Sequence, residues 1–123
     1  IDSSNEEHLR SLVSKENQKF ELIIEDAGHY LKDQIISLFI LFKILKKKGT
    51  YVVEDLDFPD TRKDMNTKDE KPTLKEILQH IKNGTDFNSK YVSNEEKIYF
   101  LSFLESIEIF KGKFNEIAFI KKK

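Results

Sequence analysis

The chain has 123 residues, and its 21 basic and 22 acidic side chains nearly cancel to a formal charge of −1. This balance argues against nucleic-acid binding, which needs a basic face or stripe. The longest apolar stretch, residues 35–42, is far shorter than the roughly 18 residues of a membrane span. The chain contains no cysteine, so disulfides and thiolate metal sites are excluded, and we expect a cytoplasmic protein with a single domain over residues 1–123.

The first part of the chain predicts a helix and then a strand. The sequence starts at Ile1 rather than at a methionine, and we expect it to be part of a longer protein. Residues 2–5 (Asp-Ser-Ser-Asn) offer helix N-cap side chains, and apolar residues at helical spacing predict a helix over residues 5–16. A strand is predicted over Phe20–Glu25. Its apolar residues 22–24 are consecutive, which is typical of a strand covered on both faces.

The longest helix is predicted over residues 30–47, with Gly49 as its C-terminal cap after the basic residues Lys46–Lys48. Its middle, residues 35–45, is apolar on nearly all sides, whereas a helix that covers one face of a sheet needs only an apolar stripe. We therefore expect its second face to meet a partner chain, giving a homo-oligomer, or a part of the protein outside these residues. A second strand is predicted over residues 50–53.

The second half of the chain alternates polar segments with short elements. The polar region from Asp55 to Lys71 predicts a mobile loop about 15 residues long, of the kind that serves as a lid or binding loop. A helix is predicted over Leu74–Lys82, and Ser93 is predicted to cap a short helix that runs through Phe103. The alternating pattern of residues 106–110 and 114–121 predicts a closing β-hairpin.

Three acidic side chains follow the two predicted strands of the first half. Asp26 comes directly after the first strand, and Glu54 and Asp55 come after the second. A strand–helix–strand crossover makes the two strands parallel, so their carboxyl ends meet at one edge, where open α/β sheets bind ligands. Oxygen-only ligands of this kind suit Mg²⁺ or Ca²⁺. The alternative is that these acids cap the next helix or lie in solvent, since acidic residues are common at strand ends.

His29 lies three residues beyond Asp26, at the start of the predicted long helix. Beside a metal-bound hydroxyl group a histidine is suited to take a proton, because its ordinary pKa lies near working pH. The alternative for His29 is a surface hydrogen bond at the helix N-terminus. The sequence has no Gly-rich phosphate loop, no GxSxG nucleophile elbow and no HExxH helix.

A resemblance to a known family is carried by the segments Glu25-Asp26-Ala27-Gly28-His29, Gln34, Gly49 and Tyr51-Val52-Val53-Glu54-Asp55. The pattern resembles the carboxyl half of the macrocin O-methyltransferase type, to which cephalosporin-hydroxylase-like proteins are related. The resemblance implies a class I methyltransferase fold, which is an α/β, Rossmann-like three-layer αβα sandwich. This chain would be its C-terminal portion, with parallel strands and a closing antiparallel hairpin, and the N-terminal cofactor-binding strands would be absent.

The same resemblance implies an activity and a set of site residues. Enzymes of this type transfer a methyl group from S-adenosylmethionine to a hydroxyl of a sugar or natural product and need Mg²⁺, so the expected partner is a small-molecule or sugar acceptor. Asp26, Glu54 and Asp55 match the metal ligands of the family, and His29 matches its catalytic base. Asp2 is a weaker match to an acid near the adenosyl part of the cofactor.

Two other interpretations remain open from the residues alone. One is a catalytically incompetent α/β interaction or dimerisation module, whose contact would be the apolar helix 30–47. The other is a different metal-assisted enzyme, a hydrolase or hydroxylase, that uses the same acidic edge. An iron oxygenase usually has two histidines and one carboxylate, whereas this edge offers one histidine and three acids. Metal dependence separates an enzyme of either kind from an interaction module.

Overall fold

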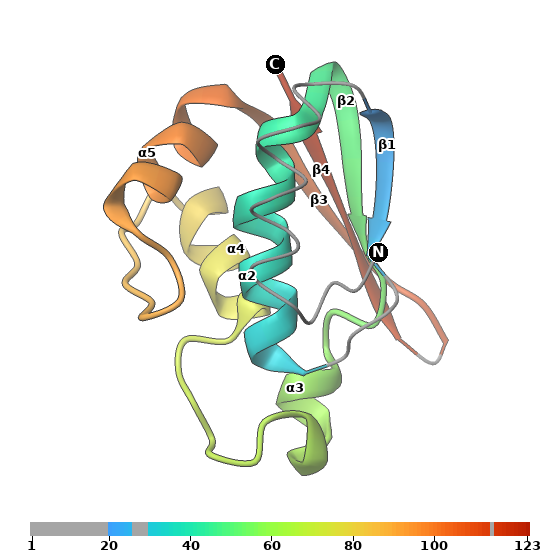
Figure 1. Ribbon diagram of the computed structural model, residues 1–123. Helices are drawn as coiled ribbons and strands as arrows, with labels where there is room; N and C mark the ends of the chain where they lie inside the picture. Colours follow the sequence, from blue (N-terminus) through green and yellow to red (C-terminus); the bar gives the residue numbers. More distant parts are fainter. Residues whose placement is uncertain (1–19, 26–29, 114) are drawn as a thin grey trace.

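The chain forms an α/β unit in a computed structural model that describes residues 20–25, 30–113 and 115–123. Four strands make one mixed sheet in the order β1-β2-β4-β3 (Figure 1). They are β1 (Phe20–Glu25), β2 (Leu45–Val53), β3 (Leu104–Lys111) and β4 (Glu116–Lys122). Strands β1 and β2 are parallel, while β4 runs antiparallel to both β2 and β3. The predicted α/β class, with a parallel pair and a closing antiparallel hairpin, is confirmed.

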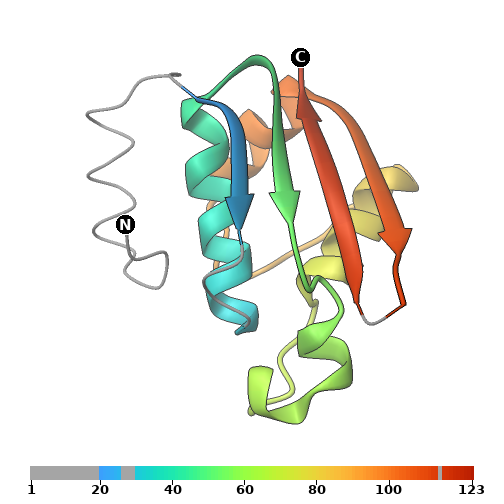
Figure 2. The same ribbon diagram turned by 90° about the vertical axis from the view of Figure 1, so that its right-hand side faces the viewer.

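Helices cover one face of this sheet. The described helices are α2 (Leu31–Leu41), which continues into the 3₁₀ turn η1 (Phe42–Ile44), α3 (Phe58–Thr61), η2 (Lys63–Met65), α4 (Leu74–Lys82) and α5 (Asn94–Phe103). Figure 2 shows α2, α4 and α5 behind the strands, whose other face is turned toward the viewer. Among the described residues, no helix combines the length and the apolar composition needed to cross a membrane.

The apolar composition of α2 is explained within one chain. Its side chains meet the sheet on one side and α4 and α5 on the other. Phe39 and Phe42 both contact the ring of Phe100 on α5, at centroid distances of 4.8 and 4.6 Å. Packing against α4 and α5 therefore accounts for the second apolar face of this helix. A homo-oligomer through helix 30–47 stays a prediction.

The predicted end of the long helix is also wrong. The α-helix ends at Leu41, one 3₁₀ turn follows, and β2 begins at Leu45, so Gly49 lies inside a strand. A Cβ atom on Gly49 would lie 2.9 Å from the Cγ of Leu45 and 3.0 Å from the backbone oxygen of Glu21. This residue is glycine because β1 and the start of β2 approach closely, and it does not cap a helix.

The region between β2 and α4 is more ordered than the predicted mobile loop. It contains α3 and η2, and the side chain of Asn66 makes two hydrogen bonds to the backbone of Glu70, at 2.9 and 3.0 Å. The helices after it agree with prediction. Thr73 starts α4 and Ser93 starts α5, and each forms a capping box with the glutamate three residues later.

Candidate active site

The carboxyl ends of β1 and β2 lie at one edge of the sheet, as the sequence predicted. The two parallel strands are paired in register, with Ile23 beside Tyr51 and Glu25 beside Val53. Glu54 and Asp55 follow β2 directly, at the end of the sheet where α3 and the start of α2 also lie (Figure 1). The other predicted site residues, Asp2, Asp26 and His29, lie outside the described residues.

Asp55 has an unusual backbone conformation that three elements hold in place. Its φ angle is +54°, in the left-handed region that aspartate and asparagine tolerate better than other side chains with a Cβ. The carbonyl oxygen of Asp55 accepts a hydrogen bond from the side-chain Nε2 of Gln34 at 3.1 Å and one from the backbone N–H of Phe58 at 3.1 Å. Its carboxylate Oδ1 accepts a hydrogen bond from Nδ2 of Asn115 at 2.8 Å. The strand end is therefore tied to α2, to α3 and to the start of β4.

Gln34 contributes only one end of its amide to this arrangement. The side chain is fully buried in the first turn of α2, and its Oε1 atom has no hydrogen-bond partner within the described part of the chain. Native proteins rarely leave a buried acceptor unpaired, and the exceptions often mark a bound water, ion or ligand. Gln34 belongs to the segments that carry the family resemblance, which implies no role for it.

Further charged groups surround this edge. The carboxylate of Asp57 accepts a hydrogen bond from the backbone N–H of Glu116 at 2.9 Å, and Lys75 pairs with the Glu116 carboxylate at 2.6 Å. Within residues 20–25, 30–113 and 115–123, no three histidine, cysteine or acidic side chains gather in a group able to hold a metal ion. The chemistry of the donor set nevertheless fits a hard cation in part, since Glu54, Asp55 and the unpaired Gln34 Oε1 all offer oxygen. A third carboxylate would have to come from beyond the described residues, where Asp26 falls.

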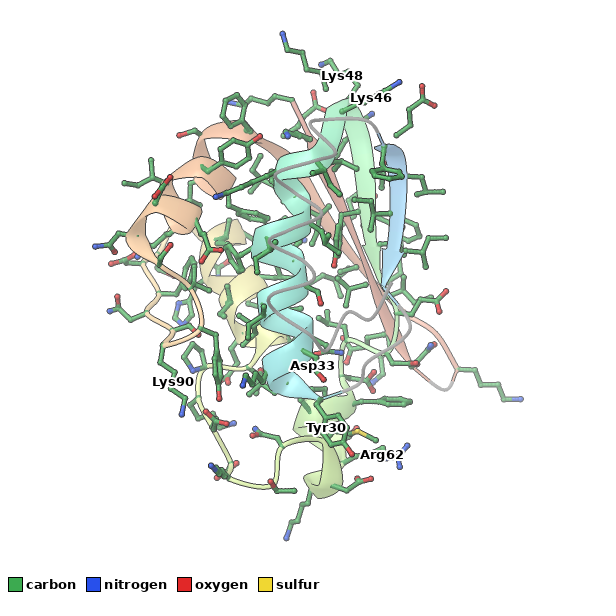
Figure 3. All side chains as sticks on the ribbon, in the orientation of Figure 1. Tyr30, Asp33, Lys46, Lys48, Arg62 and Lys90 are labelled. Atoms are coloured by element: carbon green, nitrogen blue, oxygen red, sulfur yellow. The ribbon has the colours of Figure 1, made fainter. Side chains whose placement is uncertain are left out.

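A hollow of about 330 Å³ opens beside the start of α2. Its walls come from the first turn of that helix, the segment 65–70 and Tyr91. Figure 3 shows Tyr30 and Asp33 at this end of α2, above α3, with Arg62 nearby. Tyr30 is exposed, so an aromatic ring borders a hollow lined mainly by polar side chains.

Glu70 lines this hollow and is held by an ion pair and a hydrogen bond. Its carboxylate pairs with Lys90 at 2.6 Å and accepts a hydrogen bond from the hydroxyl of Tyr91 at 2.6 Å. The bonds from Lys90 and Tyr91 lower the pKa of Glu70 below its ordinary value. Burial, and then the bond to Glu70, raise the pKa of Tyr91. This network was not predicted, because Glu70 lies in the predicted loop and is 21 residues away from Tyr91 in the sequence.

Comparisons with known proteins identify the fold. No protein-family model and no curated protein sequence matches the chain. Three solved structures of the MycE methyltransferase from the mycinamycin biosynthetic pathway are similar to it. One crystal form holds Mg and SAH (TM-score 0.68), a second crystal form holds the same two ligands (0.66), and the third structure also contains mycinamycin VI (0.65).

The similarity covers nearly all of this chain and a minor part of the others. It extends over 99% of this chain, at 18% sequence identity, and over 30–31% of the MycE chains. At this identity the match establishes fold and nothing finer, and the chain spans about a third of the length of these neighbours. The described strands and helices therefore have the Rossmann-like α/β fold of a methyltransferase.

Proposed function

We propose that this chain is the C-terminal part of an S-adenosylmethionine- and Mg²⁺-dependent O-methyltransferase. The observation that carries the proposal is the fold match over 99% of the chain to a methyltransferase whose structures contain Mg and SAH. The position of Glu54 and Asp55 supports it, because α/β sheets bind their ligands at the carboxyl edge of the strands. The substrate would be a hydroxyl group of a sugar or natural product.

The chain's own residues would divide the chemistry between them. Asp26, Glu54 and Asp55 would hold the cation, and His29 would accept the proton of the acceptor hydroxyl. When bound, S-adenosylmethionine would supply the methyl group: a C–O bond to the acceptor would replace the S–CH₃ bond of the sulfonium, whose electron pair would stay on sulfur. When bound, Mg²⁺ would supply positive charge that orients and acidifies the hydroxyl group. The protein's largest contribution would be to align donor and acceptor for in-line transfer.

The rest of the cofactor site belongs to the same proposal. Under this proposal, N-terminal strands outside these 123 residues would bind most of the S-adenosylmethionine, and Asp2 would contact the adenosyl side. The coverage of about 30% of the neighbouring chains supports this division. The polar hollow beside Tyr30 would receive the acceptor, because its lining offers hydroxyl, amide and charged groups to hydrogen-bond a polar molecule. A cytoplasmic location is likewise proposed, in keeping with a chain without cysteine.

Calorimetric titration with S-adenosylhomocysteine in the presence of Mg²⁺ tests the proposal. Binding at micromolar strength by the 123-residue chain, or by a longer product of the same gene, is the expected result. In the complete enzyme, His29→Ala should keep this binding and lose most turnover. Absence of heat with both proteins would overturn the assignment, and full turnover in the His29 variant would remove that residue from the chemistry.

The α/β interaction module remains the second candidate because of one observation. Five of the large apolar side chains that the structure leaves exposed, Phe20, Leu22, Ile24, Phe110 and Phe119, lie on the strands of the sheet rather than on its helices. An interaction module needs no cation. Titration with Mg²⁺ therefore separates the two functions.

A further inference from the structure

The backbone at Asp55 is held by more contacts than a surface turn needs. A residue with a Cβ and a φ of +54° is at a disfavoured angle, and such angles persist where the surroundings fix them. Here Gln34 and Phe58 donate to the carbonyl oxygen, and Asn115 donates to the carboxylate. These donors come from segments up to 60 residues away in the sequence. Both the backbone and the side chain of Asp55 are thus oriented by the tertiary fold.

Asn115 fixes the rotation of the carboxylate. Its Nδ2 lies 2.8 Å from Oδ1 of Asp55, in a contact that is partly buried. A carboxylate can accept about four hydrogen bonds or ligand contacts, and the bond from this neutral donor restricts its rotation without adding a charge. Hydrogen bonds of this kind to ligating carboxylates are a general feature of metal sites.

Gln34 is oriented by the same residue. Its Nε2 must face the carbonyl oxygen of Asp55, since the reverse amide orientation would place two oxygens against each other. Its Oε1 is therefore fixed as a buried acceptor beside the acidic edge, with no partner among the described residues. A group in this state is satisfied when a donor, such as a water on a bound cation, occupies the site.

We propose that Gln34 and Asn115 are positioning residues of a divalent-cation site at Asp55. Asn115 holds the carboxylate of Asp55, and Gln34 holds its backbone while its Oε1 accepts a hydrogen bond from a water molecule of the cation. The inference rests on the proposed function, which places the cation there. It adds two residues whose roles neither the sequence pattern nor the comparisons assign.

Titration of the 123-residue chain with Mn²⁺, followed by electron paramagnetic resonance, tests this arrangement. Gln34→Leu and Asn115→Leu are each expected to weaken Mn²⁺ binding 10- to 100-fold, as removal of such supporting hydrogen bonds typically does. Gln79→Leu and Asn88→Leu make the same chemical changes at exposed positions and should bind as the unmodified chain does. Asp55→Asn, which removes the ligand charge, should abolish binding.

Thermal unfolding of the metal-free proteins separates positioning from a structural role. Gln34→Leu removes a buried unpaired oxygen, which favours the folded state, and one of two donors to the carbonyl oxygen of Asp55, which disfavours it. Its melting temperature should therefore change little while its Mn²⁺ affinity falls. A fall in melting temperature with unchanged Mn²⁺ affinity would indicate a structural role and overturn the inference for Gln34. Unchanged affinity in both leucine variants, with binding lost in Asp55→Asn, would overturn the inference and leave the proposed function standing. Absence of Mn²⁺ binding by the unmodified chain would overturn the metal site both in this inference and in the proposed function.

Discussion

The two faces of the sheet differ sharply, although the same four strands make both. On the face toward the helices, Tyr51, Val53, Ala118 and Ile120 are fully buried. On the opposite face, Leu22 and Ile24 are 55% and 52% exposed and Phe110 is 54% exposed, and the pairing register places Ile24, Val52 and Phe119 in one row across three strands.

The exposed, open face of the sheet has the apolar composition that is usual for a buried face. Sheets with parallel strands are usually covered on both faces, and the consecutive apolar residues of β1 follow that pattern. In the part of the chain that the structure describes, α2, α4 and α5 cover one face only. The difference teaches that contacts among the described residues account for the apolar side chains on the helical face of the sheet and leave those of the open face unexplained.

The largest test of this contrast compares two phenylalanines. Phe39 is buried in α2 between the rings of Phe87 and Phe100, whereas Phe119 lies on the open face. Phe39→Ala should lower the free energy of unfolding by about 3–5 kcal/mol because it leaves a cavity in the core. Phe119→Ala should change it by less than about 1 kcal/mol. Urea denaturation of both variants measures the pair, and equal losses would show that the open face is as well packed as the core.

A smaller change in the free energy of unfolding is expected when two adjacent lysines of β4, which point to opposite faces of the sheet, are each replaced. Lys122 is 1% exposed, and its Nζ donates to the carbonyl oxygens of Phe42 and Leu45 and to the hydroxyl of Tyr99, at 2.8–3.0 Å. Lys121 has a long contact of 3.9 Å with Glu105 in solvent.

Replacing each lysine by methionine keeps most of the side-chain volume. Lys122→Met should cost about 2–3 kcal/mol because buried carbonyl groups lose their donor. Lys121→Met should stay within about 0.5 kcal/mol, as is usual for exposed ion pairs. Chemical denaturation checks both values, and a stable Lys122 variant would mean that water replaces the ammonium group.

The smallest change in stability is expected from the Glu70 carboxylate, which makes a polar contact near the surface. The pKa of Glu70 is lowered by hydrogen bonds from Lys90 and Tyr91, so its contribution to stability is present above its unfolded-state pKa. That contribution is lost as the pH falls through the lower pKa of the folded state. Glu70→Gln should therefore be less stable than the unmodified chain at pH 7, and the two should converge in acid.

Denaturation curves between pH 7 and pH 3 measure this convergence. Lys90→Met, which removes the largest cause of the pKa shift, should reduce the pH dependence without abolishing it, because Tyr91 still donates. Parallel curves for the unmodified chain and Glu70→Gln would show that the Glu70 contact does not contribute to folding.

Local signals made much of the fold predictable. The crossover of β1, α2 and β2 followed from two apolar runs around a helical pattern, and α4 has the predicted bounds because its start is set by a capping box at Thr73. The end of α2 could not be predicted in the same way. The carbonyl oxygens of Phe42 and Leu45 are satisfied by Lys122, which lies 80 and 77 residues further along the chain. A contact of that length leaves no trace in the local sequence.

In the candidate site, too, the features set by local sequence were predictable and those set by long-range contacts were not. The positions of Glu54 and Asp55 were predictable because both residues directly follow a predicted strand. The supporting hydrogen bonds from Gln34 and Asn115 span 21 and 60 residues, so they appear only in the folded structure. The roles of Asp26, His29 and Asp2 stay predictions, since these residues lie outside the described part of the chain. The predicted mobile loop was wrong because short helices and the Asn66 bonds to Glu70 carry no strong periodicity.

The place of β4 in the sheet bears on how this chain is synthesised. It is the last strand of these 123 residues, yet it lies between β2 and β3. As the ribosome releases the chain from its N-terminus, β2 and β3 each keep an unpaired edge until residues 116–122 emerge, and such edges invite pairing with other chains. Lys122, which donates to the carbonyl oxygens of Phe42 and Leu45 just after α2, emerges with the same segment. Completion of the sheet therefore waits for residues 116–122, and a product that stops before Glu116 would leave the edges of β2 and β3 that β4 covers open to aggregation.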